Sequence, residues 1–142
     1  MLDLTIEKEI KISASTKNVW EVLTNPVHIK KYLFGSDAKS DWQKGSPIVF
    51  SGEYQGQKYE DHGNILDIEK EKLLRYDYWS SFSGVDDVPE NYSTITFQLE
   101  GPDMEITLHL TQKGFVSRDG YEHSQQNWEM VLGEIKKIAQ SL

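Results

Sequence analysis

Cysteine is absent from the 142 residues of the chain. This absence excludes a disulfide framework, a thiol nucleophile and a cysteine-ligated metal. No apolar run approaches the ~18 residues of a membrane-spanning helix. No apolar stretch follows a positively charged start, as it would in a secretory leader. We therefore expect a cytoplasmic protein without a membrane span.

Positive charge is also scarce. The 15 Lys and Arg residues are outnumbered by 23 Asp and Glu residues, so the formal net charge is −8. Proteins that follow the phosphates of nucleic acids, or that dock on anionic lipid, do so with clustered cations. The charge balance argues against both kinds of partner, and we expect no nucleic-acid binding.

Apolar and aromatic residues, in contrast, are plentiful enough for a core. Hydrophobic residues make up 37% of the chain, and the aromatic set comprises four Trp, seven Tyr and five Phe. A chain of this length is typical of one domain and buries roughly 68% of the surface that its unfolded form exposes. We therefore expect a single domain over residues 1–142 that needs neither a disulfide nor a metal ion to fold.

The N-terminal part predicts one strand followed by two short helices. Apolar and polar side chains alternate over residues 2–12, as in a half-buried strand. Lys8 interrupts the apolar side, and we interpret it as a strand-edge lysine whose stem packs while its ammonium reaches water. Ser15 is a suitable N-cap for a helix within residues 13–24, and Pro26 can open the second helix.

Turn residues then separate a series of alternating segments. Gly63 lies inside the longest of them and predicts a bulge or bend. The irregular stretch 80–91 is predicted to be a mobile loop, and the periodicity of residues 119–142 predicts a long amphipathic helix. The individual strands predicted by alternation run over residues 48–54, 58–70, 73–79, 92–100 and 104–113.

The order of these elements predicts an α+β fold. About six antiparallel strands follow the short helices, and hairpin-linked strands of this kind form a curved sheet. Such a sheet can wrap around one long C-terminal helix that covers its concave face, while the short helices close one end.

Four segments resemble those of a known family. They are residues 10–15 (IKISAS), 19–26 (VWEVLTNP), 106–115 (ITLHLTQKGF) and 127–132 (NWEMVL). Their order and spacing resemble the START-like (SRPBCC) superfamily, and within it the group similar to the C-terminal domain of the activator of heat-shock protein 90 ATPase. The resemblance implies a helix-grip fold with a cavity between the sheet and the long helix. Members of the superfamily bind lipids, sterols, polyketides or other apolar molecules, and some are enzymes.

Signals of catalysis are weak. No pair among the four histidines has metal-ligand spacing, and no nucleophile elbow, phosphate-binding loop or dinucleotide motif is present. His62 follows Asp61 directly, so on a strand the two side chains point to opposite faces. His109 lies on the polar side of its strand. We therefore expect no catalytic residue, no metal and no cofactor, although a cyclase, dehydratase or hydrolase stays open as a weaker option.

Large apolar side chains are the more informative set, because ligand cavities are mostly apolar with a few polar groups. For Phe97 we favour simple filling of the core, whereas for Phe50, Trp79 and Trp128 core filling and cavity lining stay equally open. Tyr78 is our preferred polar anchor. Trp79 and Phe82 flank the loop 80–91, which suits a lid. The predicted ligand-binding residues are Tyr32, Phe50, Tyr78, Trp79, Phe82, Phe97, Trp128 and Leu132.

Two functions of different classes follow from this pattern. The first is a binding protein that holds a small hydrophobic ligand, such as a lipid or an aromatic metabolite, between the sheet and the C-terminal helix. The second is a co-chaperone-like or stress-response module with a solid interior, whose acidic surface steers it to a basic face of a protein partner.

Overall fold

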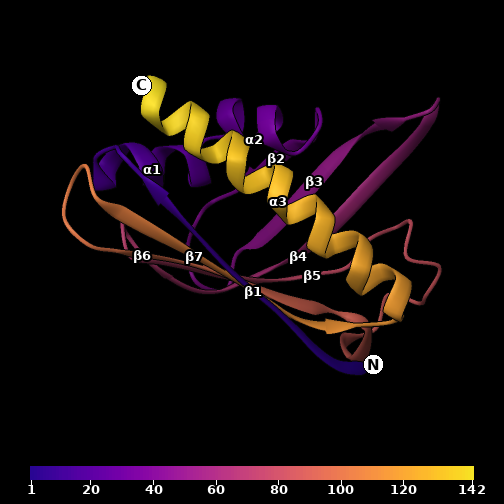
Figure 1. Cartoon of the computed structure of the whole chain (residues 1–142). Helices are drawn as coiled ribbons and strands as arrows, with labels where there is room; N and C mark the ends of the chain where they lie inside the picture. The colour runs from indigo at the N-terminus through magenta and orange to yellow at the C-terminus, as the bar shows by residue number, and fades with distance from the viewer.

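One antiparallel sheet and one long helix form the two main layers of the computed structural model, which describes residues 1–142 (Figure 1). Two short helices lie beside the C-terminal half of the long one. The elements in chain order are β1 (Leu2–Ile12), α1 (Thr16–Thr24), α2 (Pro26–Tyr32), β2 (Asp37–Ser40), β3 (Pro47–Tyr54), β4 (Gln57–Glu69), β5 (Leu73–Tyr78), the 3-10 turn η1 (Pro89–Asn91), β6 (Ser93–Glu100), β7 (Ile106–Phe115) and α3 (Arg118–Ser141).

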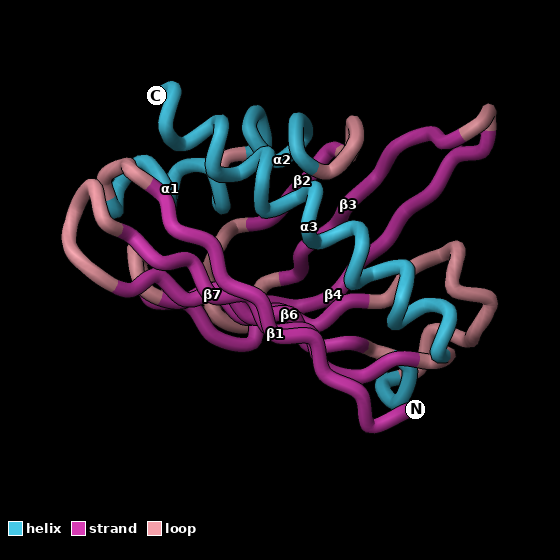
Figure 2. The backbone as a smooth tube through the Cα atoms, in the orientation of Figure 1, coloured by secondary structure: helices cyan, strands magenta, loops and turns pink.

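The sheet has the strand order β1-β7-β6-β5-β4-β3-β2, and every neighbouring pair is antiparallel. The first strand therefore pairs with the last, and β1 and β2 are the two edges. Figure 2 shows the strands curving under α3, with the β3–β4 hairpin rising beside it. The predicted α+β helix-grip architecture is confirmed. No helix in it is both long and apolar enough to cross a membrane.

Gly63, where the sequence predicts a bulge or bend, lies next to the point at which β4 changes partners, and the register shift of β4 falls just after it, between Ile65 and Asp67. β4 pairs with β3 as far as Asn64 and with β5 from Ile65 onward. At Gly63 a Cβ atom would lie 1.8 Å from the backbone oxygen of Asp77, so only glycine allows this approach. The backbone amide of Asn64 also donates to the Asp77 carboxylate over 2.7 Å. Gly63 thus joins the two halves of the sheet.

A side-chain cap begins each of the three α-helices, and the sequence predicts the one at Ser15. Ser15 accepts a hydrogen bond from the amide of Asn18, at the start of α1. Asn25 ends α1 and its side chain accepts from the amide of Val27, so the same residue starts α2. Ser117 caps α3 in the same way. Such caps satisfy amides that have no partner within the helix.

The core lies between α3 and the concave face of the sheet. α3 packs chiefly on β1 and α1, and its buried stripe has the predicted helical spacing. It consists of Trp128, Val131, Leu132, Ile135, Ile138 and Ala139. Alternate residues of β7 meet this stripe, since Ile106, Leu108 and Leu110 are almost fully buried.

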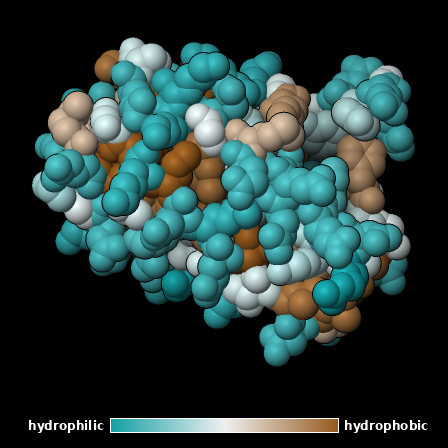
Figure 3. Space-filling view, in the orientation of Figure 1, coloured by the Kyte–Doolittle hydropathy of each residue, from teal (hydrophilic) through white to brown (hydrophobic).

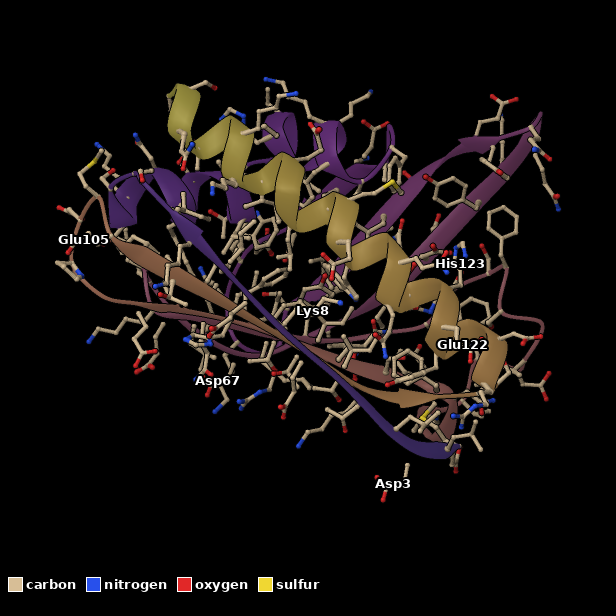
Figure 4. All side chains as sticks on the ribbon, viewed as in Figure 1. Asp3, Lys8, Asp67, Glu105, Glu122 and His123 are labelled. Atoms are coloured by element: carbon tan, nitrogen blue, oxygen red, sulfur yellow. The ribbon has the colours of Figure 1, made fainter.

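Lys8 connects the edge strand to the long helix. Its side chain is on the core side of β1 and only 17% exposed, and its Nζ lies 2.6 Å from Oε1 of Glu129 on α3. Figure 4 shows Lys8 below α3. The lysine stem packs as predicted, while the ammonium is held by a carboxylate at the edge of the helix as well as reaching water.

Candidate functional site

Apolar side chains from the sheet, the three α-helices and the segment between β2 and β3 surround a small cavity. Its volume is about 10 Å³, which is close to the ~10–15 Å³ that a single water molecule needs. Figure 4 shows side chains filling the space between α3 and the sheet. The cavity wall is hydrophobic throughout and consists of Leu23, Ile29, Tyr32, Leu33, Trp42, Ile48, Phe50, Leu74, Tyr76, Phe97 and Trp128.

Four of the eight predicted ligand-binding residues lie in this wall, and two more lie next to it. The four are Tyr32, Phe50, Phe97 and Trp128. Leu132 is buried one helical turn after Trp128 but belongs to the neighbouring part of the core. Tyr78 lies just behind the wall, with its ring 6.0 Å from the ring of Phe50. Six of the eight therefore form one continuous apolar region.

Trp79 and Phe82 lie outside the wall and hold the loop 80–91. Because Tyr78 faces inward, Trp79 faces the other side of the sheet, where its ring lies 5.3 Å from that of His62. Its indole N–H donates to the backbone oxygen of Val85. Phe82 is 49% exposed, and its ring lies 5.5 Å from that of Tyr59 on the β3–β4 hairpin.

A buried hydrogen bond fixes the orientation of Trp128. Its indole N–H donates to Oε1 of Gln112 over 2.7 Å, and Gln112 on β7 is only 7% exposed. The indole also meets Phe97 edge-on, with ring centroids 5.8 Å apart. The indole N–H of Trp128 thus has its hydrogen-bond acceptor within the protein, and the apolar part of the ring lines the cavity.

Three tyrosine hydroxyls enter this apolar region. Tyr78 donates to Oδ2 of Asp61 over 2.6 Å. Burial raises the pKa of Tyr32, Tyr76 and Tyr78 well above the ordinary value for tyrosine. The nearby Tyr76 raises the pKa of Tyr32 further, and the nearby Asp61 does the same for Tyr78. The three phenols are therefore neutral at physiological pH and can act as hydrogen-bond donors.

Two carboxylates fasten the loop 80–91 to the sheet. Buried Asp61 accepts from both the backbone amide and the hydroxyl of Ser81, at 2.8 and 3.0 Å. Asp87 accepts from the hydroxyl of Tyr92 and lies 2.8 Å from Nε2 of His62. The hydrogen bond from Tyr92, and after it His62, lower the pKa of Asp87. Asp61 and His62 point to opposite faces, as predicted, and each holds a different part of the loop.

Sequence reasoning missed two aromatic residues of the cavity wall. Tyr76 shares the inward side of β5 with Leu74 and Tyr78, so alternation alone could have identified it. Trp42 lies in an irregular stretch and has a positive φ of 55°, a conformation that bulky residues rarely adopt. Its amide donates to the hydroxyl of Ser40. No periodic signal marks Trp42, because a turn rather than a strand or helix directs it.

The outer face of the sheet carries a separate open groove. It lies between β1, β7 and β6 and is lined mostly by polar and charged residues. His109 lies there as predicted, with Nδ1 3.4 Å from Glu9 and Nε2 2.8 Å from Glu100. No group of three or more His, Asp or Glu side chains in the structure is arranged to hold a metal ion.

Comparison with known proteins agrees with this geometry. Residues 13–140 match the family described as Activator of Hsp90 ATPase homolog 1-like protein. The chain is 37% identical to ChR145 from Cytophaga hutchinsonii, whose solution structure gives a TM-score of 0.84 over 99% of this chain and 97% of that one. No curated protein matches.

More distant structures share the fold. The Aha1 dimer from Colwellia psychrerythraea is 20% identical, with a TM-score of 0.75 over 96% of both chains. CalU16 from Micromonospora echinospora is 19% identical, with a TM-score of 0.73 over 95% of this chain and 75% of that one. With residues 13–140 matched to the family, the chain belongs to the Activator of Hsp90 ATPase homolog 1-like family of the START-like (SRPBCC) superfamily.

Proposed function

We propose that the chain binds a small, mostly apolar molecule between the concave face of the sheet and α3. The observation that supports this most is the wall of the small cavity, which is hydrophobic throughout and rich in rigid aromatic rings. Burial of apolar ligand surface there stabilises a complex by ~25 cal/mol per Å². Tyr32, Phe50, Phe97 and Trp128 would contact the ligand directly, with Tyr78 and Leu132 supporting them.

Binding requires the cavity to expand, because a ligand site of ordinary size occupies roughly 300–1,000 Å³. α3 packs chiefly on β1 and α1, while the β3–β4 hairpin stands on its other side (Figure 1). Figure 3 shows the surface hollowed between α3 and that hairpin. We place the entrance there, where Phe82 of the loop 80–91 packs on the hairpin. Release of Ser81 from Asp61 would let this loop move aside.

Native mass spectrometry of the freshly purified protein tests the proposal. We expect an added mass that is lost on denaturation. Leu33→Phe, which fills the cavity from its wall, should reduce the occupied fraction. Val27→Phe is the matched control, because Val27 lies on α2, whose C-cap is Leu33, and is 64% exposed.

The bare mass in every preparation, together with no thermal stabilisation by the uncharged probes 2-acetylnaphthalene and 2-ethylnaphthalene, would contradict ligand binding. Equal occupancy in the Leu33→Phe and Val27→Phe proteins would place the ligand elsewhere.

A protein-interaction role is the second candidate, and the nearly closed interior favours it. A co-chaperone-like or stress-response module needs no cavity, and the net charge of −8 suits a basic partner surface. Titration of a purified Hsp90-type chaperone with the protein tests this. A rise in ATPase rate at low salt that is lost at high salt would support it, and an unchanged rate at both would count against it.

A further inference from the structure

The cavity wall contains two buried hydroxyls without a protein partner. Tyr32 and Tyr76 are only 4% and 6% exposed, and no hydrogen bond contributes to the raised pKa of either hydroxyl. His28 Nδ1 is the only fully enclosed side-chain N or O atom that lacks a partner. The oxygens of Tyr32 and Tyr76 therefore border open space, and the space that both residues line is the cavity.

Neighbouring polar groups in the same region are paired. Tyr78, two residues after Tyr76 on the same side of β5, donates to Asp61. The indole N–H of Trp128 donates to Gln112. Native structures seldom leave buried polar groups unpaired, because the group gives up its hydrogen bonds to water and gains nothing in return. The hydroxyls of Tyr32 and Tyr76 have no such partner and border the cavity, so both are free to donate to a molecule within it.

The chemistry of the wall restricts what that atom can be. The phenols remain protonated, so each offers an O–H donor. No Lys, Arg or His lines the cavity, and a buried carboxylate or phosphate without a cation is strongly disfavoured. A ligand amine would find no carboxylate in the wall either. The polar end of the ligand is therefore uncharged and accepts hydrogen bonds.

We propose that the cavity takes an uncharged apolar molecule with a carbonyl-type oxygen, which accepts hydrogen bonds from the hydroxyls of Tyr32 and Tyr76. This inference rests on the proposed function, since it specifies the ligand class of the same site. One carbonyl oxygen has two lone pairs and can accept from both phenols. Tyr32 comes from α2 and Tyr76 from β5, so such a ligand also joins the helix to the sheet.

Two nearly isosteric probes, 2-acetylnaphthalene and 2-ethylnaphthalene, test the inference because they differ in one carbonyl oxygen. Their affinities are measured by equilibrium dialysis with absorbance detection. We expect the wild-type protein to bind the ketone about tenfold more tightly. Tyr32→Phe and Tyr76→Phe should each reduce that ratio, and the double variant should abolish it. Tyr121→Phe, whose ring packs on Phe115 away from the cavity, should leave it unchanged.

The outcomes separate the two proposals. If both probes bind with equal affinity, or if the ratio survives in the double variant, ligand binding stands and the carbonyl inference is wrong. If neither probe binds the wild-type protein, the proposed function fails together with the inference.

Thermal unfolding of the ligand-free variants adds a second test. Removing a hydroxyl that has no partner should leave the Tm of Tyr32→Phe and Tyr76→Phe unchanged or raise it. A decrease of several degrees in both would mean that the hydroxyls are paired within the protein, and would overturn the inference.

Discussion

Trp128 of α3 donates its indole N–H to Gln112 of β7 across 2.7 Å, and this buried hydrogen bond links the long helix to the sheet beneath it. The bond fixes one wall of the cavity. A ligand that enters therefore meets a preset indole surface, and the room for it has to come from the other side, where Phe50 and Tyr76 lie.

The strength of this link is measurable by a double-mutant cycle. We expect Gln112→Met to lower the free energy of unfolding by ~1–3 kcal/mol, because it leaves the indole N–H buried without an acceptor. In the Trp128→Phe protein, which lacks the indole N–H, Gln112→Met should lower the free energy of unfolding by a smaller amount. Urea unfolding of the four proteins gives the coupling energy, and strictly additive effects would mean that the hydrogen bond contributes nothing.

A pair of glycine variants tests the junction in β4. Gly63→Ala would bring a Cβ atom within 1.8 Å of the Asp77 backbone oxygen, and we expect it to lower the free energy of unfolding by about 3 kcal/mol or more. Gly133→Ala on α3 meets nothing within 4 Å and should instead stabilise the protein by ~0.5–1 kcal/mol, since alanine is the better helix former. Thermal unfolding compares the two, and equal effects would refute the close approach at Gly63.

Asp61 should govern how tightly the loop 80–91 is held. Asp61→Asn keeps the size of the side chain but removes the charge that accepts bonds from Tyr78 and Ser81. We expect Asp61→Asn to lower the free energy of unfolding by ~1.5–3 kcal/mol, the usual contribution of hydrogen bonds to charged groups. The backbone amides of the loop should also exchange their hydrogens faster. Exposed Asp86 makes no side-chain hydrogen bond, so Asp86→Asn is the matched control. Unchanged exchange in the Asp61→Asn protein would contradict the proposed fastening.

Alkaline titration should separate the tyrosines into groups. The pKa of Tyr92 is raised from 10.0 to about 12 by burial and by Asp87, and Tyr32, Tyr76 and Tyr78 are raised by burial. A raised pKa in the folded state gives stability that is complete below pH ~10 and is lost as pH rises further. Absorbance at 295 nm, followed with circular dichroism, should therefore show the three buried phenols ionising only as the protein unfolds. Ionisation of all seven tyrosines near pH 10 in a folded protein would contradict this.

Regular spacing made most of the fold predictable. Alternation identified β1 and β3–β7, and helical periodicity identified α3 and its buried face, because one side of each element faces the core. Strand β2 was not predicted individually, since it has four residues of which only Ala38 is buried. Likewise, Ser15 and Pro26 marked helix starts through purely local chemistry.

The site was harder to predict, because its residues meet through tertiary structure. Trp42 reaches the cavity from a turn with a positive φ, which leaves no periodic trace. The pairing of Asp87 with Tyr92 and His62 depends on how a loop folds back. Trp79 was a plausible cavity residue by size, yet its neighbour Tyr78 takes the inward direction. The same aromatic residues can enclose a large cavity or nearly fill it, so composition could not indicate a volume near 10 Å³.

The pairing of β1 with β7 has a consequence for biosynthesis. Residues 2–12 are synthesised before the rest of this domain, but their partner strand ends at Phe115 and the helix that covers them follows it. The apolar side of β1 therefore stays unpaired until β7 and α3 have also been translated. Contacts between segments so distant in sequence slow folding, and an exposed strand edge invites association with other nascent chains. Completion of the fold thus waits for the synthesis of β7, which joins β1 to the sheet, and of α3, which covers the core.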